Sequence, residues 1–222
     1  MNFISAFEVI GPNMVGPSSS HTAGAVSIGK MARKLFKEKV TEVTFTLYGS
    51  FARTYKGHGT DRALLGGVLG FETDDLRIRD AFSWAEKMGV KYQYIADKEF
   101  VPDHPNTVDI QMTGENGTKM QVQGQSIGGG KIKITQINGI NVEFTGEYST
   151  LVVKQIDKPG VVTHITQCLS NQNVNIAFMR LFREGKGKTA YSVVESDERI
   201  PDEILEEIRQ NPYVQEILLI QI

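Results

Sequence analysis

The chain has 222 residues, of which 24 are basic and 26 acidic, and its formal net charge is -2. This length suffices for one large domain or two smaller ones, each with its own core. No basic stripe follows the sequence, which argues against a nucleic-acid partner. No apolar run reaches the ~20 residues that span a bilayer, so no membrane association is expected. The N-terminus lacks the basic start and apolar stretch of a signal peptide. We therefore expect a soluble cytoplasmic protein.

The first unit is expected to cover residues 1–146 and to be of the α+β class. Apolar spacing predicts its helices and strands. In chain order they are a helix at 23–36, a strand at 40–47, helices at 63–71 and 76–88, a strand at 91–95, a hairpin of strands at 108–112 and 120–124, and strands at 131–136 and 140–144. Three loops rich in glycine and hydroxyl groups separate these elements, at 11–24, 56–61 and 126–130.

The first loop contains two Gly-Pro steps, then Ser18, Ser19, Ser20, His21 and Thr22, directly before a predicted helix. Unpaired N–H groups at a helix start, together with hydroxyl groups, favour a carboxylate or phosphate. His21 adds an imidazole whose unperturbed pKa lies near neutrality. This loop therefore indicates a site where a small anionic substrate meets a proton-transfer group. The alternative is that Ser20 or Thr22 caps the helix and His21 is a solvated neighbour.

The second loop places His58 between Gly57 and Gly59 and is followed by Thr60 and Asp61. Glycines on both sides remove bulk around the imidazole and let it approach a ligand closely. Asp61 is expected either to cap the next helix or to orient the imidazole. The alternative is a tight turn with an exposed histidine.

The third loop, Ser-Ile-Gly-Gly-Gly at 126–130, offers backbone amides without covering side chains. Such amides form an anion-binding concavity, and Gly128 and Gly129 are the candidates. The alternative is a bulge at a sheet edge or a flexible connector.

The second unit, residues 147–222, has a regular alternation of elements that predicts the order β-α-β-β-α-β of a ferredoxin-like sandwich. The predicted strands and helices lie at 149–156, 161–171, 174–182, 189–195, 201–210 and 214–222. The only cysteine, Cys168, falls in the first of these helices and is interpreted as a small buried apolar residue. One cysteine permits no intrachain disulfide and no cluster held by cysteines of this chain alone.

This unit resembles the ACT domain, a regulatory module that binds small ligands. The resemblance lies in Asp-Lys-Pro-Gly at 157–160 and Asn-Val-Asn-Ile at 173–176. It implies a site for an amino-acid effector, often across a homodimer contact. The implied effector-binding residues are Asp157, Gly160, Val161 and Asn175, with His164 and Arg180 as further candidates by position. The alternative is a domain that serves only for assembly.

The whole chain resembles the β subunit of bacterial iron–sulfur-dependent L-serine dehydratase. The resemblance is carried, in order, by Gly-Pro-Ser-Ser-Ser-His-Thr-Ala-Gly at 16–24, Gly-His-Gly-Thr-Asp at 57–61, Ser-Ile-Gly-Gly-Gly at 126–130 and the ACT tail. It implies an L-serine ammonia-lyase in which a partner α subunit ligates a 4Fe-4S cluster, while this chain holds no metal. The first unit is also similar to the allosteric substrate-binding domain of some phosphoglycerate dehydrogenases.

From this resemblance we expect the β chain to form walls of the active site. His58 is the first choice for a proton-transfer role and His21 the second. The hydroxyl groups of Ser18, Ser19, Ser20 and Thr22 are expected to bind the substrate carboxylate or to orient the histidine. Gly128 and Gly129 are expected to donate amides to the same anion or to shape the subunit interface.

Two other functions remain open from the sequence. One is a non-catalytic regulatory protein that senses an amino acid through both domains. The other is a stand-alone hydrolase using Ser20 and His21. The hydrolase is disfavoured because adjacent residues rarely point a nucleophile and its base at each other, and no Gly-x-Ser-x-Gly elbow is present.

Overall fold

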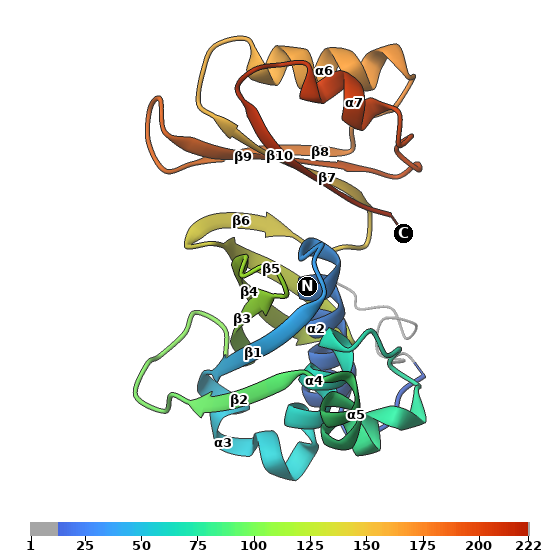
Figure 1. The fold of residues 1–222 in the computed structure, drawn as a ribbon, viewed down its shortest axis with the longest axis vertical. Helices are drawn as coiled ribbons and strands as arrows, with labels where there is room; N and C mark the ends of the chain where they lie inside the picture. The colour runs from blue at the N-terminus through green and yellow to red at the C-terminus, as the bar shows by residue number, and fades with distance from the viewer. Residues whose placement is uncertain (1–12, 222) are drawn as a thin grey trace, which may run out of the picture. The chain divides into compact units, whose positions relative to one another are not determined.

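The computed structural model describes residues 13–221. The chain divides into two compact units, Met1–Asn138 and Gly139–Ile222 (Figure 1). The division falls before strand β6 (Ile140–Phe144), whereas the boundary expected from the sequence falls after it. No helix within the described residues is both long and apolar enough to cross a membrane.

The first unit is a mixed α/β layer structure, which confirms the α+β class. Its elements in chain order are η1 (Ser19–Ala23, one turn of π-helix), α2 (Gly24–Leu35), β1 (Val40–Leu47), α3 (Gly49–His58), α4 (Thr60–Val68), η2 (Leu76–Asp80, a 3-10 turn), α5 (Ala81–Met88), β2 (Lys91–Ala96), β3 (Thr107–Gly114), β4 (Lys119–Gly128) and β5 (Lys131–Ile137). Within this unit the strands lie in the order β2-β1-β3-β4-β5. β1 and β2 are parallel, and the other neighbouring pairs are antiparallel.

One face of this sheet is apolar because the strands alternate in side-chain type. Val43, Phe45 and Leu47 of β1 are fully buried, and the threonines between them are half-buried. Helix α2 packs on β4 and β5, and α4 packs on α2; Figure 1 shows α2, α4 and α5 gathered together. The hydrophobic core of the unit lies between these helices and the apolar sheet face.

Helices α2 and α4 approach each other backbone to backbone. A Cβ atom at Gly29 would overlap the carbonyl oxygen of Leu64, and one at Gly67 would overlap that of Val26. The small residues that weaken the intrinsic helix propensity of α4 are therefore required by this packing. The same contact fixes the start of α2, where the first loop ends.

The prediction of a loop at 56–61 is wrong, because most of this segment is helical. Lys56, Gly57 and His58 form the last turn of α3, and α4 begins directly at Thr60. Only Gly59 leaves the helix, with a left-handed φ of 68°. A glycine in this conformation is a common helix terminator, so the two glycines mark a helix end and not a loop.

The third loop is also shorter than expected. Ser126 and Ile127 continue β4, and the register of the β4–β5 pair shifts between Ser126 and Gly128. Gly129 and Gly130 then form the turn into β5, both with positive φ. A bulge is thus present, as the alternative of a bulge at a sheet edge proposed, but β4 lies between β3 and β5 and not at an edge.

The second unit confirms the predicted order β-α-β-β-α-β. After β6 it contains β7 (Ser149–Ile156), α6 (Val161–Asn171), β8 (Phe178–Arg183), β9 (Thr189–Ser196), α7 (Ile204–Arg209) and β10 (Val214–Ile220). The four strands from β7 onward form an antiparallel sheet in the order β10-β7-β9-β8, and Figure 1 shows α6 and α7 on the same face of it. Apolar residues from both helices and the sheet form one core, which includes Cys168 as expected.

Candidate active site

The serine loop ends in a capped turn that fixes the position of His21. Ser18 is in extended conformation, and its Oγ accepts a hydrogen bond of 3.1 Å from the backbone N–H of His21. The Thr22 N–H donates to the Ser18 carbonyl oxygen at 2.8 Å. The cap is therefore Ser18, and not Ser20 or Thr22 as the simpler interpretation proposed. Ser19 and Ser20 lie within the turn with half-buried side chains.

Helix α3 supplies the surface on which the His21 imidazole rests. His21 Nε2 lies 2.9 Å from Ser50 Oγ, where either group can donate depending on the imidazole tautomer. The Phe51 ring meets the imidazole edge-on, with centroids 5.3 Å apart. Ser50 and Phe51 stand in the first turn of α3, so the start of this helix holds the ring of His21.

His58, in the last turn of α3, contacts the imidazole of His21. Its ring centroid lies 4.7 Å from that of His21, with an angle of 33° between the ring planes. Ser50, Thr54 and His58 are spaced four residues apart, so they share one helix face. On this face Thr54 Oγ1 donates to the Ser50 carbonyl oxygen at 2.8 Å, and His58 Nδ1 lies 3.4 Å from the Thr54 carbonyl oxygen.

A second tether joins the serine loop to the end of α3. The buried Thr22 hydroxyl donates to the His58 carbonyl oxygen at 3.2 Å. That carbonyl belongs to the last turn of the helix, where carbonyl groups lack a helical N–H partner. The two motifs identified in the sequence therefore form one site, with Thr22 and His21 contacting opposite ends of α3.

Burial lowers the pKa of His21 below its ordinary value, and the neighbouring His58 lowers it further. Both causes disfavour the protonated imidazole, because a buried charge loses hydration and a second cation repels it. At neutral pH His21 is therefore neutral, with one nitrogen available as an acceptor. A neutral imidazole can accept a proton from a neighbouring group, so His21 is suited to proton transfer.

A cavity of about 270 Å³ opens beside His58, and we call it the His58 cavity. It is lined by Val15, Gly16, Pro17, Thr22, Lys56, Gly57, His58, Gly59, Arg62, Ile78 and Arg79. Its size is near the lower end of the ~300–1,000 Å³ usual for small-molecule sites. His58 and Thr22 belong both to the cavity and to the histidine pair.

The third motif meets the serine loop at the start of α2. A Cβ atom at Gly24 would overlap the hydroxyl of Ser126, so glycine is needed there for β4 to approach. Gly128 and Gly129 lie further along, with positive φ of 103° and 60° and open space beside Gly128. Among residues 13–221 no hydrogen bond joins these two glycines to either histidine.

Sequence reasoning missed Ser50 and misjudged Asp61. Ser50 could have been found from its spacing of eight residues to His58, once the segment is taken as helical. Asp61 neither caps α4, whose cap is Gly59, nor bonds an imidazole; its Oδ1 accepts from the Arg62 N–H at 2.8 Å. Burial raises the pKa of the Asp61 carboxyl.

Comparison with known proteins identifies the family. The family model described as serine dehydratase beta chain matches residues 5–95, and the ACT domain model matches residues 149–212. A protein of Bacillus subtilis named "Probable L-serine dehydratase, beta chain" is 42% identical over 214 residues, which is 96% of each chain. This chain belongs to the serine dehydratase beta-chain family.

Two further relatives match most of this chain, one with the same name and one with another. The "L-serine dehydratase, beta chain" of Peptoniphilus asaccharolyticus is 48% identical over 176 residues, covering 79% of each chain. A "D-3-phosphoglycerate dehydrogenase" of Bacillus subtilis is 26% identical over 200 residues, covering 89% of this chain but 37% of that protein. The beta-chain sequence is thus similar to part of a longer enzyme with another name.

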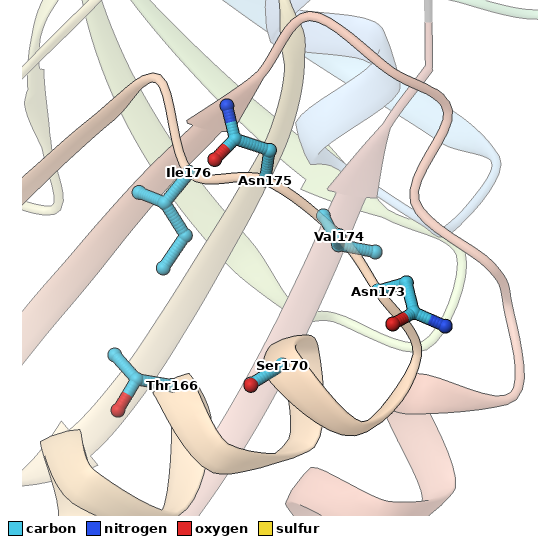
Figure 2. A pocket seen from close by; sticks show the side chains of 6 residues that line it. All are labelled: Thr166, Ser170, Asn173, Val174, Asn175 and Ile176. Carbon is cyan, nitrogen blue, oxygen red and sulfur yellow. The ribbon is translucent and has the colours of Figure 1, made fainter.

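The candidate effector residues of the ACT domain do not meet within one chain. Gly160, with a φ of 87°, precedes α6, and Asn175 follows its end, so the full length of α6 separates them. Asn175 lines a pocket of about 450 Å³ with Thr166, Ser170, Asn173, Val174 and Ile176 (Figure 2). Thr166 and Ser170 come from α6, and Asn175 itself is exposed.

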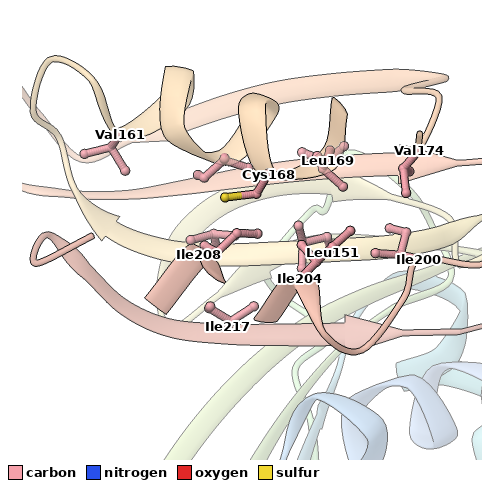
Figure 3. Close-up of a cluster of buried hydrophobic side chains, with 12 residues drawn as sticks. Leu151, Val161, Cys168, Leu169, Val174, Ile200, Ile204, Ile208 and Ile217 are labelled. Atoms are coloured by element: carbon pink, nitrogen blue, oxygen red, sulfur yellow. The ribbon is translucent and has the colours of Figure 1, made fainter. Parts of the chain in front are cut away.

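The other candidates of this domain have partners in the structure. The Val161 side chain is buried in the core below α6 (Figure 3). Asp157 Oδ2 accepts from Arg183 at 3.3 Å and from the Gly187 N–H at 3.4 Å. His164 Nε2 lies 3.0 Å from the Glu207 carbonyl oxygen and 3.7 Å from Cys168 Sγ, and it joins α6 to the segment of α7.

Arg180 lies on β8 between two carboxyl groups. Its guanidinium is 3.5 Å from Glu143 Oε1 and 3.7 Å from Glu195 Oε2, and it donates to the Glu143 carbonyl oxygen at 3.1 Å. Of the six effector candidates, only Asn175 lines the pocket beside α6.

We predict that NMR titration of the full chain gives a His21 pKa below the ordinary 6.5. The His58→Gln variant should move this pKa upward but leave it depressed, because burial is the larger cause. Since the unfolded chain binds the proton more readily, the free energy of unfolding should fall as pH drops from about 6.5 through the His21 midpoint. A His21 midpoint at or above 6.5 would contradict this account.

Proposed function

We propose that this chain is the β subunit of an L-serine ammonia-lyase, which converts L-serine to pyruvate and ammonia together with an α subunit. The observation that carries the proposal is the contact between His21 and His58, with ring centroids 4.7 Å apart, in a chain 42% identical to a named L-serine dehydratase β chain. The two histidines come from separate motifs and are in ring contact, and one of them, His58, lines the cavity. Such a pair suits a reaction that moves a proton from carbon.

In the proposed reaction an imidazole takes the Cα proton of serine. The electrons of that C–H bond form the Cα–Cβ double bond, and the Cβ–O bond breaks, with hydroxide leaving as water after it gains a proton. The resulting aminoacrylate tautomerises and is hydrolysed to pyruvate and ammonia. General acid–base catalysis of this kind contributes about 10²–10⁴-fold in rate.

We assign the proton transfer from Cα first to His58, because it lines the cavity, and second to His21. His21 is held by Ser50 and Phe51 and contacts the ring of His58, but it does not line the cavity itself. The Ser18 cap serves to orient His21. Ser19, Ser20, Thr22, Gly128 and Gly129 remain proposed substrate-binding groups, with Thr22 the one that lines the cavity.

The proposed enzyme also contains a 4Fe-4S cluster, which the family resemblance assigns to the α subunit. When bound there, the cluster would act as a Lewis acid toward the serine hydroxyl. The residues of this chain do not fit such a cluster: its single cysteine is buried in the second unit, and residues 13–221 contain no group of three or more metal-ligating side chains. Every step assigned here to this chain therefore uses its own side chains.

The direct test is anaerobic co-expression with the α chain, followed by a serine-to-pyruvate assay of the complex and of each chain alone. We expect turnover only from the iron-containing complex. Stable serine binding by this chain, with no pyruvate from any combination, would contradict the proposal and favour the non-catalytic sensor.

Within that complex, His58→Gln should lower kcat by about 10²-fold or more, because it removes a general acid–base group. The matched control is Arg53→Gln, an exposed position on the same helix that does not line the cavity. Iron content measured on each preparation separates loss of the base from loss of the partner's cluster. Near-normal turnover of His58→Gln with full iron content would remove His58 from the mechanism.

We further propose that the ACT domain binds L-serine or another small amino acid and joins two β chains. Gly160 and Asn175 lie at opposite ends of α6. A dimer that places Gly160 of one chain beside Asn175 of the other would therefore bring the effector-binding residues together. Asn175→Ala in the full chain should then weaken amino-acid binding about tenfold or more, as loss of a hydrogen bond to a charged group does.

Equilibrium dialysis of the full chain measures this binding, and sedimentation measures the dimer. The His58→Gln chain is the control, since it alters the first unit only and should retain the ACT site. Dimerisation without any amino-acid binding at millimolar concentration would leave the domain a role in assembly alone.

A further inference from the structure

The His58 cavity is lined by cationic side chains from three different elements. Lys56 comes from α3, Arg62 from α4 and Arg79 from η2. The imidazole of His58 lies on the same lining. None of the described residues that line the cavity is acidic. A volume walled by three permanent positive charges has an electrostatic potential that attracts anions.

Within residues 13–221 no salt bridge joins these three cations to a carboxylate, although the Asp61 carboxylate interacts electrostatically with Arg62 and Lys56. The ion pairs of the first unit in this range include Lys30 with Glu72 and Arg77 with Asp75, and neither of these involves a cation of the cavity. The nearest acidic group in sequence, Asp61, bonds the Arg62 backbone N–H through its carboxylate and does not line the cavity.

Two of these cations also contact aromatic rings. The Arg62 guanidinium lies 5.7 Å from the Phe82 ring centroid, and Lys56 Nζ lies 5.8 Å from that of Tyr55. Stacking of this kind steadies a long side chain while leaving its N–H groups free to donate. Arg62 and Lys56 thus present donors to the cavity while their charges interact with Asp61 outside its lining.

The backbone around Gly59, at the edge of the His58 cavity, also favours an anionic ligand. Gly59 ends α3 with a left-handed conformation and is also the residue before α4, a helix of nine residues. The first N–H groups of α4 have no helical acceptor, and the dipole of the helix is positive at this end. Gly57 and Gly59 have no side chain, and no atom lies within 4 Å of a Cβ built on either, so a ligand can approach the backbone.

We infer that the His58 cavity binds the carboxylate of the substrate, with Arg62 and Lys56 as its principal charged donors and Arg79 as a third. This inference rests on the proposed function and specifies its geometry. A carboxylate held there places the adjacent Cα beside His58, which lines the same volume. The cations of the cavity repel the ammonium group of the substrate. Molecules with a carboxylate next to the reacting carbon are therefore expected to bind more tightly than amines without one.

The hydroxyl groups of Ser18 and Ser50 then serve to hold His21, and they do not bind the carboxylate.

The test is steady-state kinetics of the α–β complex carrying Arg62→Gln or Lys56→Gln. KM for L-serine should rise about tenfold to a hundredfold, the size expected for a lost hydrogen bond between charged groups, while kcat changes by only a few-fold. Arg62→Lys should restore part of the loss. Arg53→Gln, exposed on α3 and outside the cavity, is the matched control and should leave KM unchanged.

Two inhibitors separate recognition of the carboxylate from a general structural effect. L-lactate has the carboxylate without the ammonium group, and ethanolamine has the ammonium group without the carboxylate. Arg62→Gln should raise the inhibition constant of L-lactate by the same factor as KM and leave that of ethanolamine unchanged. Unchanged KM and unchanged L-lactate inhibition in both variants would overturn the inference, even in an active enzyme.

The inference can be decided even if the complex shows no serine turnover, which is the outcome that defeats the proposed function. L-Lactate is then titrated into the full β chain alone, with the His58 ring proton followed by NMR. A shift that saturates in the wild type and in Arg53→Gln, but not in Arg62→Gln, supports the anion site. No shift in the wild type, or the same shift in all three chains, overturns it.

Discussion

The site depends on the attachment of one short turn to one helix. The turn Ser19–Ala23 is joined to α3 by two hydrogen bonds, one between the imidazole of His21 and Ser50 and one from the hydroxyl of Thr22 to the His58 carbonyl oxygen. Each contact alone is a single hydrogen bond, worth about 1 kcal/mol in net stability. Together they tie the turn that bears His21 to both ends of α3, which bears His58. Without them the two imidazoles would belong to independent surface elements.

The helices behind the turn make this attachment rigid. Gly29 and Gly67 let α2 and α4 touch backbone to backbone, and Gly24 admits Ser126 of β4 against the start of α2. Elements that pack so closely have few alternative positions, because protein interiors are dense and resist small displacements. The glycines of the first unit thus have two uses. Some permit close packing, and others, such as Gly59, end a helix at the cavity.

Much of the fold could be predicted from the sequence, since apolar periodicity is strongest in long regular elements. The bounds of β1, β7 and α6 agree with the prediction, and so does the order of elements in the ACT domain. Helix α3 was missed because Gly57 and Gly59 are typical of loops, while the packing that stabilises the helix comes from distant residues. Strand β8 begins later than predicted, at Phe178.

The candidate site could be predicted in composition but not in arrangement. The motifs around His21 and His58 identified the two imidazoles, and the structure places their rings in contact. The partner of His21, Ser50, lies 29 residues away and becomes visible only once α3 is known to be a helix. The cations of the His58 cavity come from separate elements, and no local pattern in the sequence joins them. Long-range placement of this kind is determined by tertiary packing.

The central claim is that His21 and His58 act as one proton-transfer unit. A double-mutant cycle of kcat in the α–β complex, with His21→Gln, His58→Gln and both together, tests it most directly. The account predicts strong non-additivity, so that the double variant loses little more activity than the more damaged single variant, with a coupling of about 1–3 kcal/mol. Losses that multiply, with no coupling, would show that the two histidines act independently and would contradict the account.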